Sequence, residues 1–150
     1  MSEPTPERPR DPVLRLVDLR ETPLVIDEVV AALDDESSGG LTLFVGRVRD
    51  HDHGKGVVGL DYSAHPSALD TLHDVCARVA AAHDVHGLAA VHRVGSLDIG
   101  DIAVVVAVAS AHRGTAFDAS RMLIDTLKDE VPIWKHQRFS DGSEEWVGSP

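Results

Sequence analysis

Eight consecutive residues in the second half of the chain, IAVVVAVA at positions 102–109, carry only apolar side chains. Successive side chains of a β-strand point to opposite faces, so a strand with one solvated face alternates apolar and polar residues. Here both faces are apolar. We therefore expect residues 102–109 to form an interior strand of a sheet whose two faces are both covered by other elements.

The segments around this strand alternate between strand-like and helix-like patterns. Further strands are expected at residues 13–19, 41–48, 57–63 and 88–94. Three segments repeat apolar residues at helical spacing, and they begin near Thr22-Pro23, His65-Pro66-Ser67 and His112-Arg113. The first helix is expected to take Thr22 as its cap and to end at the breaker Ser37-Ser38-Gly39-Gly40.

Two polar stretches predict the remaining connections. The segment DHDHGKG at residues 50–56 has turn residues and no apolar side chain, which is typical of a mobile surface loop. Asp141-Gly142 lies between two β-rich segments and indicates a closing hairpin. Hairpins mixed with helical crossovers predict one α+β domain over residues 13–150, with a mixed or antiparallel sheet and packed helices.

The third helix, within residues 110–131, is flanked by cations. Its expected buried face includes Ala116, Phe117, Ser120, Leu123, Ile124, Leu127 and Val131, and Pro132 forbids its continuation. Arg113 lies at its start, where unpaired N–H groups and the helix dipole favour an anion. Because two positive side chains are unfavourable there, His112 and Arg113 together indicate a bound anion.

Composition excludes several classes of partner. The chain has 14 Lys+Arg against 25 Asp+Glu, a net charge of −11, so its overall field repels nucleic acid and anionic membranes. An anionic ligand must then be held by a local group of cations. The single Cys76 excludes an intrachain disulfide and favours a reducing compartment, and we expect it to be a packed apolar residue. Residues 1–12 are rich in Pro and charge and predict a disordered leader, so a cytoplasmic protein is expected.

Several short motifs, in order along residues 41–147, together resemble one known family. They are Phe44-Val45-Gly46-Arg47-Val48-Arg49, His92-Arg93-Val94-Gly95, Ser110-Ala111-His112-Arg113, Asp125-Thr126-Leu127-Lys128, Pro132-Ile133-Trp134-Lys135 and Trp146-Val147. Each motif alone is weak, but their order and spacing resemble the large, catalytic subunit of molybdopterin synthase.

This resemblance implies a reaction and a set of partners. Two sulfurs would pass to cyclic pyranopterin monophosphate and form the dithiolene of molybdopterin. The sulfur donor would be the thiocarboxylated Gly-Gly tail of a small ubiquitin-like subunit. The implied fold is an α+β domain of hammerhead type that forms a homodimer within a heterotetramer, with no metal and no organic cofactor.

The resemblance also carries site residues onto this chain. The substrate-contacting positions fall on Arg47, Val48, Arg49, His112, Arg113, Lys128, Lys135, His136 and Gln137. Arginines suit phosphate oxygens, so we assign Arg49, His112 and Arg113 to phosphate and pterin binding. Lys128 and Lys135 are assigned the chemistry, since a thiocarboxylate and a developing oxyanion both need a fixed cation. His136 and Gln137 stand where the family usually has a basic residue and Glu.

Other interpretations remain open at this point. Lys128 has the spacing to share a solvated ion-pair face with Asp118, Arg121 and Asp125. Arg47 and Arg49 would point the same way from an edge strand and discourage aggregation. A protein of this fold could also dock the small subunit without turnover. Finally, His51, His53, His65 and His73 could bind a metal ion, and a neighbouring copy could supply Arg138 to the pocket.

Overall fold

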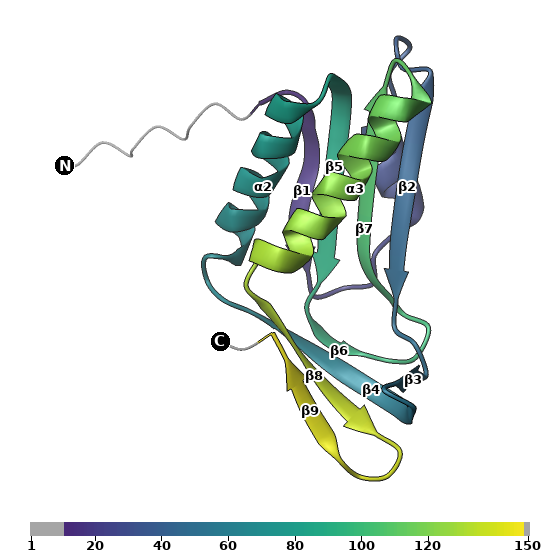
Figure 1. Ribbon diagram of the computed structural model, residues 1–150, viewed down its shortest axis with the longest axis vertical. Coiled ribbons are helices and arrows are strands. Elements are labelled where there is room, and N and C mark those ends of the chain that lie inside the picture. The colour runs from purple at the N-terminus through teal and green to yellow at the C-terminus, as the bar shows by residue number, and fades with distance from the viewer. Residues whose placement is uncertain (1–10, 149–150) are drawn as a thin grey trace, which may run out of the picture.

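The computed structural model describes residues 11–148 (Figure 1). Only two residues of the predicted disordered leader, Asp11 and Pro12, fall in this range, and the rest of the leader lies outside the described residues. Within residues 11–148 none of the helices combines the length and apolarity required to cross a bilayer.

A four-stranded sheet forms the upper part of the molecule in Figure 1. Its strands, in spatial order, are β1 (Leu14–Arg20), β5 (Val85–Arg93), β7 (Ile102–Ser110) and β2 (Gly40–Arg47). β1 runs parallel to β5, and the other pairs are antiparallel. β7 lies inside the sheet, as its sequence predicts.

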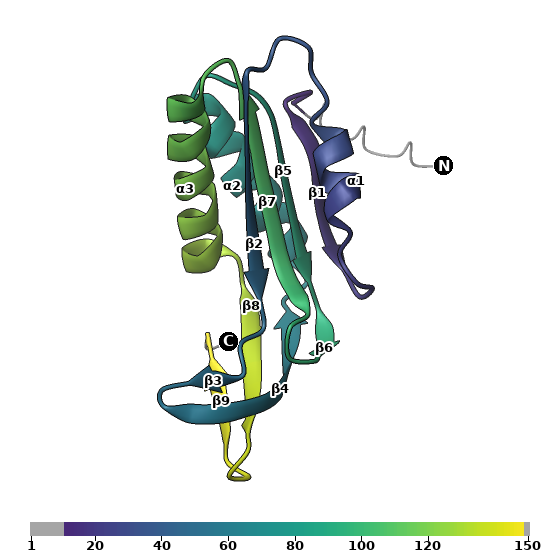
Figure 2. The same ribbon diagram turned by 90° about the vertical axis from the view of Figure 1, so that its right-hand side faces the viewer.

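Helices cover both faces of this sheet, as Figure 2 shows. α2 (Ala68–Ala82) and α3 (Arg113–Glu130) pack on one face, and α1 (Ile26–Ala32) packs on the other. β7 contributes alternately to the two layers. Val104, Val106 and Val108 join the core under α2 and α3, whereas Val105, Ala107 and Ala109 join the core under α1. The α+β class and the mixed sheet are thus confirmed.

A second, curled sheet extends from the end of the first sheet (Figure 1). It contains β3 (His51–Asp52), β4 (Lys55–Ala64), β8 (Ile133–Phe139) and β9 (Glu144–Val147), with β6 (Gly95–Leu97) also paired to β4. All of these pairs are antiparallel. β8 and β9 form the predicted closing hairpin.

The prediction of a mobile surface loop at residues 50–56 is wrong in part. β3 pairs with the start of β4, so this segment is a tight hairpin with a two-residue turn at His53 and Gly54. Both turn residues have positive φ, 50° and 75°, which is the backbone of a compact hairpin turn. Backbone pairing needs no apolar side chain, and a hydrophobic pattern therefore could not reveal it. β6 was not predicted because its three residues are too few to show an alternating pattern.

Two further expectations are corrected. α1 begins at Ile26, with Val25 at its cap position and no capping side chain, so Thr22-Pro23 does not start the helix. Phe117 is 62% exposed instead of lying on the buried face of α3. Cys76, in contrast, is fully buried as expected, and burial raises the pKa of its thiol to about 12.

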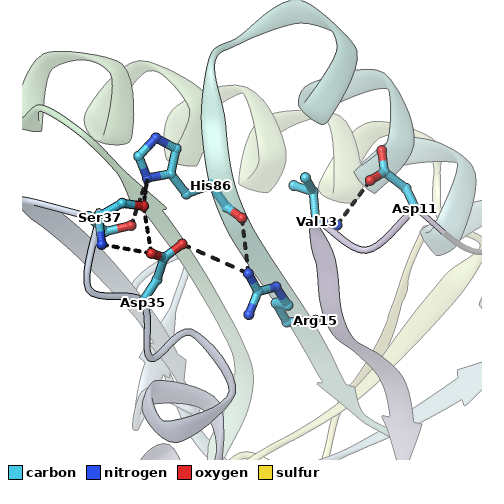
Figure 3. Close-up of polar contacts among 7 residues, drawn as sticks. Asp11, Val13, Arg15, Asp35, Ser37 and His86 are labelled. Carbon is cyan, nitrogen blue, oxygen red and sulfur yellow. Dashed lines mark hydrogen bonds and ion pairs between the residues drawn. The ribbon is translucent and has the colours of Figure 1, made fainter.

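A polar cluster fixes the connection between α1 and β2 (Figure 3). The Ser37 hydroxyl donates to Asp35 Oδ1 at 2.6 Å and lies 3.2 Å from His86 Nδ1 at the start of β5. Arg15 of β1 is paired with Asp35 at 3.9 Å and donates to the His86 carbonyl at 3.4 Å. The cluster therefore fastens the connection to the first residues of two strands.

Two glycines follow this cluster and pack on the turn that precedes α3. A Cβ at Gly39 would lie 2.5 Å from the Ala111 carbonyl oxygen, and one at Gly40 would lie 3.2 Å from the Arg113 backbone. The backbone of residues 111–113 is thus held directly against residues 39–40. This contact requires glycine at position 39.

Gly39→Ala is expected to destabilise the fold by about 1–3 kcal/mol, because backbone atoms at 2.5 Å cannot make room for a methyl group without moving. Gly114→Ala is the matched control. It lies in the first turn of α3 with nothing within 4 Å of its added Cβ, so it should be neutral or stabilising by up to about 1 kcal/mol. Urea unfolding of both variants measures the difference, and equal midpoints would contradict the packing argument.

Candidate functional site

The site is organised by the change of direction between α3 and β8. α3 ends at Glu130, Pro132 prevents a further turn, and β8 starts at Ile133. The His65 N–H donates to the Pro132 carbonyl at 3.0 Å, which ties this corner to the end of β4. Lys128, in the last turn of α3, and Lys135, the third residue of β8, are thereby brought to one place.

Lys135 occupies the middle of a three-stranded ribbon. Its strand partners are Tyr62 on β4 and Val147 on β9. A pocket of about 220 Å³ lies beside it and is lined by both lysines together with Tyr62, His92 and Val147. The structure thus places the two predicted catalytic lysines in one pocket.

The surroundings of this pocket change the proton affinities of two bases. Lys128 is an exposed residue, but the protein atoms near its ammonium partly desolvate it, and this desolvation, followed by the charge of Lys135, lowers its pKa. Burial lowers the pKa of His92 to about 4, so its ring is neutral near pH 7. The His92 Nδ1–H donates to the Arg93 carbonyl at 2.7 Å, which leaves Nε2 as the acceptor of the ring.

The ion-pair interpretation of α3 holds for two of its residues. Arg121 pairs with Asp125 at 3.7 Å on the exposed face. Among residues 11–148 no carboxylate lies within 4.0 Å of the Lys128 ammonium. Lys128 is exposed and lines a surface pocket with Asp125, but it forms no ion pair with the described carboxylates there.

A second, smaller pocket lies on the other side of Lys135. It has a volume of about 60 Å³, and its lining includes Arg47, Arg49, Asp52, Lys135 and Gln137. Tyr62 also lines both pockets, so Lys135 and Tyr62 form the wall between them. Four cations, two from the end of β2 and two around Pro132, are therefore collected in an otherwise acidic molecule.

The predicted residues of the 47–49 segment differ in how they are held. Arg47 is exposed and donates from Nε to the Gly100 carbonyl at 3.3 Å. Val48 is buried, and its N–H and carbonyl pair with Asp101 and Gly100. Arg49 follows the end of β2 and is exposed. Val48 thus anchors the segment and leaves the two arginines at the pocket.

A carboxylate faces these cations from the β3–β4 hairpin. Gln137 is 3% exposed and donates from Nε2 to Asp52 Oδ2 at 2.8 Å. Arg49 lies 3.6 Å from Asp52 Oδ1. The hydrogen bond from Gln137, followed by the charges of His53, Lys135 and Arg49, lowers the pKa of Asp52, so it is ionised at neutral pH.

His136 does not lie in these pockets. Side chains alternate along β8, so Lys135 and Gln137 share one face while His136 and Arg138 share the other. The His136 ring stacks on Trp146 with centroids 4.4 Å apart and lies 3.4 Å from Glu144. Arg138, considered as a contribution to a neighbouring pocket, is paired with Asp61 on the same outer face.

His112 and Arg113 also lie elsewhere. Residues 110–113 meet the start of β2, because Gly40 pairs with Ser110, whereas Arg47 at the end of β2 pairs with Ile102. The length of α3 separates Arg113 from Lys128 by about 22 Å, at a rise of ~1.5 Å per residue. Both side chains are exposed at the start of α3. The structure does not bring Arg49, His112 and Arg113 of one chain into a single pocket.

The lining residues that were not predicted as site residues include Asp52, Tyr62 and His92. Asp52 belongs to a segment expected to be a loop, and His92 follows a buried strand and was expected to be structural. Tyr62 contacts the His92 ring edge to face at 4.9 Å. The pairing of Tyr62 with Lys135 across β4 and β8 was the available signal, but it requires the strand register.

The histidines of the metal-binding interpretation are dispersed. His51 pairs with Asp50 at 2.8 Å, and His65 lies 2.8 Å from the Ser67 hydroxyl. One of them, His53, has ligand atoms of Asp52 and Glu145 near it, all within 4.8 Å of one another. Asp52 is already engaged by Gln137 and Arg49.

Fold and site together define an α+β domain in which two lysines share a pocket beside an arginine-lined pocket, and this arrangement suits an enzyme acting on an anionic substrate. The family model described as MoaE protein matches residues 19–130. A Mycobacterium tuberculosis protein named molybdopterin synthase catalytic subunit 1 is 46% identical over 87% of this chain and 88% of its own length. The corresponding Bacillus subtilis protein is 36% identical over 87% and 83%. The chain therefore belongs to the family of molybdopterin synthase catalytic subunits.

Solved structures agree with this membership. The crystal structure of molybdopterin synthase from Staphylococcus aureus matches with a TM-score of 0.81 and 31% identity, and the match covers 90% of this chain and 98% of that one. The molybdopterin biosynthesis MoaE protein from Burkholderia ambifaria matches with a TM-score of 0.76 and 32% identity over 89% of each chain. The hammerhead-type α+β fold is confirmed.

The pKa of Lys128 can be tested directly, because the chain has only three lysines: Lys55, Lys128 and Lys135. Labelling with an amine-reactive reagent across a pH series, read by peptide mass spectrometry, should give Lys128 a midpoint below 10.5. Lys135→Met should raise that midpoint, since a neighbouring positive charge is removed. Lys55→Met should leave it unchanged. A Lys128 midpoint that does not respond to Lys135→Met would contradict the charge coupling.

Proposed function

We propose that this protein catalyses sulfur transfer as the large subunit of a molybdopterin synthase. It transfers two sulfurs to cyclic pyranopterin monophosphate, one from each of two thiocarboxylated Gly-Gly tails of the small ubiquitin-like subunit, and each tail is left as a carboxylate. The two sulfurs form the dithiolene of molybdopterin. The observation that carries the proposal is the position of Lys135 between a pocket with Lys128 and His92 and a pocket with Arg47 and Arg49. The reaction is expected in the cytoplasm, where a free thiol such as Cys76 stays reduced.

The arginine-lined pocket is assigned to the substrate. The pterin monophosphate is anionic, and a guanidinium can donate two parallel hydrogen bonds to phosphate oxygens. Arg47 and Arg49 lie at this pocket from the end of β2. Their neighbour Val48 fixes the backbone and not the ligand, through its two bonds to the 100–101 turn.

The lysine pair is assigned to the reacting groups. Lys135 lies at the boundary of the two pockets, so its ammonium can stabilise the thiocarboxylate and the oxyanion that forms during acyl transfer. Lys128 has a lowered pKa, and a lysine that titrates closer to neutral pH can give or accept a proton. His92 accepts from inside the same pocket and is neutral, which avoids adding a third positive charge beside the lysines.

A homodimer accounts for the separation of His112 and Arg113 from the other site residues. β2 is an edge strand, and its apolar side chains Leu41, Leu43 and Phe44 are more than 40% exposed, as is Phe117 of α3. A two-fold axis perpendicular to β2 would place two copies of this strand antiparallel. The start of β2 in one copy would then lie beside Arg47 and Arg49 of the other. Each pocket would thus be completed by His112 and Arg113 of the second copy.

The assembly proposed is therefore a heterotetramer. Two large subunits meet at β2, and one small subunit docks on each outer end, with its tail directed toward Lys135. The structure neighbour from Helicobacter pylori, a complex of subunits 1 and 2 of molybdopterin-converting factor, matches with a TM-score of 0.67 and supports the fold.

Reconstitution tests the enzymatic function. The protein is mixed with a thiocarboxylated small subunit and cyclic pyranopterin monophosphate, and molybdopterin formation is followed. Lys135→Ala should lower the rate by about 100-fold or more, since a fixed cation at the reacting atoms is lost. Lys55→Ala is the matched control and should remain active, because Lys55 lies at the start of β4 and pairs with Asp141 on the β8–β9 turn at 3.4 Å. Docking without turnover in the unaltered protein would instead support a scaffold.

Mixing two inactive variants tests the shared pocket. If Arg113 acts in the pocket of the other copy, Lys135→Ala and Arg113→Ala should each be inactive alone. In a mixed dimer one pocket keeps both residues, so random reassociation should restore about a quarter of the unaltered rate. A mixture as inactive as its parents, with mixed dimers verified by mass spectrometry, would show that Arg113 acts within its own chain or not at all.

A further inference from the structure

The arginine-lined pocket contains one carboxylate among the described residues, and that carboxylate is Asp52. Its position depends on the β3–β4 hairpin, whose two-residue turn holds β3 beside β4. Gln137 lies on β8, 85 residues away in the sequence, and donates to Asp52 at 2.8 Å. A flexible acidic loop would not make such a contact with a buried amide.

The chemistry of this pair fixes the orientation of Gln137. An ionised carboxylate can only accept hydrogen bonds, so the amide nitrogen of Gln137 must face Asp52 and the amide oxygen must face away. Gln137 and Lys135 lie two residues apart on the same face of β8, and both line this pocket. The pair therefore provides a neutral acceptor near Lys135 and a negative charge on the neighbouring hairpin.

We propose that Asp52 is the positioning residue of this site and supplies the negative charge that faces its cations. It orients Gln137 through a hydrogen bond and holds Arg49 through an ion pair at 3.6 Å. Among the described residues Asp52 makes no ion pair with Lys135 within 4.0 Å, so it interacts with that ammonium only as a more distant charge and contacts the site through Gln137 and Arg49. The inference rests on the proposed function for its kinetic consequences, but the placement of the charge can be tested without turnover.

Three variants separate charge from structure. Asp52→Asn keeps an oxygen that can accept from Gln137, so the contact is retained and the charge is removed. Gln137→Glu in the Asp52→Asn background restores the negative charge on β8 in place of β3. In this double variant the amide at position 52 donates to the carboxylate at position 137, so the direction of the hydrogen bond is reversed. Asp52→Glu keeps the charge and tests the position of the carboxylate. Urea unfolding of all three serves as the control for folding.

The kinetic test compares kcat with KM in the reconstituted reaction. Asp52→Asn should lower kcat by about tenfold, because Gln137 and Arg49 lose the charge that positions them. KM for the anionic pterin should stay equal or fall, since the pocket becomes more positive. The double variant should recover most of kcat. An unchanged kcat in Asp52→Asn would overturn the inference. So would a rise in KM together with a fall in the unfolding midpoint, if the double variant reverses neither.

Binding of inorganic phosphate tests the charge without the small subunit or the pterin. Asp52→Asn should bind phosphate about threefold or more tightly than the unaltered protein, and the double variant should return to the original affinity, as expected for adding and removing one nearby charge. Equal phosphate affinity in all of them would overturn the inference whatever the reconstituted reaction shows. If the unaltered protein forms no molybdopterin, that result would contradict the proposed function and not the placement of the charge.

Discussion

The burial of β7 on both faces is the constraint on which the rest of the structure depends. Its valines and alanines contribute to two separate cores, one under α2 and α3 and one under α1. Because β2 and β5 both pair along nearly all of β7, this one strand determines where the neighbouring strands start and end. Arg47 and Arg49 lie at the end of β2, and Arg113 follows the end of β7, which is the opposite end of the sheet. Their separation is therefore a property of the core and not of flexible surface segments.

The site uses desolvation to give ordinary residues unusual properties. Close packing lowers the pKa of Lys128 and keeps His92 neutral, while the charge of Asp52 is maintained by Gln137 and the surrounding cations. A net charge of −11 means that these cations are a local exception. Lys135, half-buried between β4 and β9, is the cation at which the two pockets meet, so an anionic ligand can reach it in a molecule that otherwise repels anions.

The sequence predicted the parts of the fold that depend on local patterns. The apolar run at 102–109 indicated an interior strand, and Pro132 indicated the end of α3. The cations of residues 47–49 and the two lysines were found from motifs, and the structure collects them around Lys135. The register of β4 against β8, the Asp52–Gln137 contact and the two-residue strand β3 depend on pairing between distant residues, which no local pattern records. Phe117 was misplaced because helical spacing does not reveal that β2, beneath α3, is an edge strand.

The alternation of side chains along β8 makes the length of the α3–β8 corner a determinant of chemistry. Lys135 and Gln137 point into the arginine-lined pocket, while His136 stacks on Trp146 at the back of the same ribbon. One residue added between Val131 and Ile133 would, if β8 slipped by one place, exchange the two faces. The indole of Trp134 would then stand where the ammonium belongs, and Lys135 would take the place of His136, although the composition of the strand would be unchanged. In this chain the spacing from the end of α3 to Lys135 is thus as much a part of the site as the lysine itself.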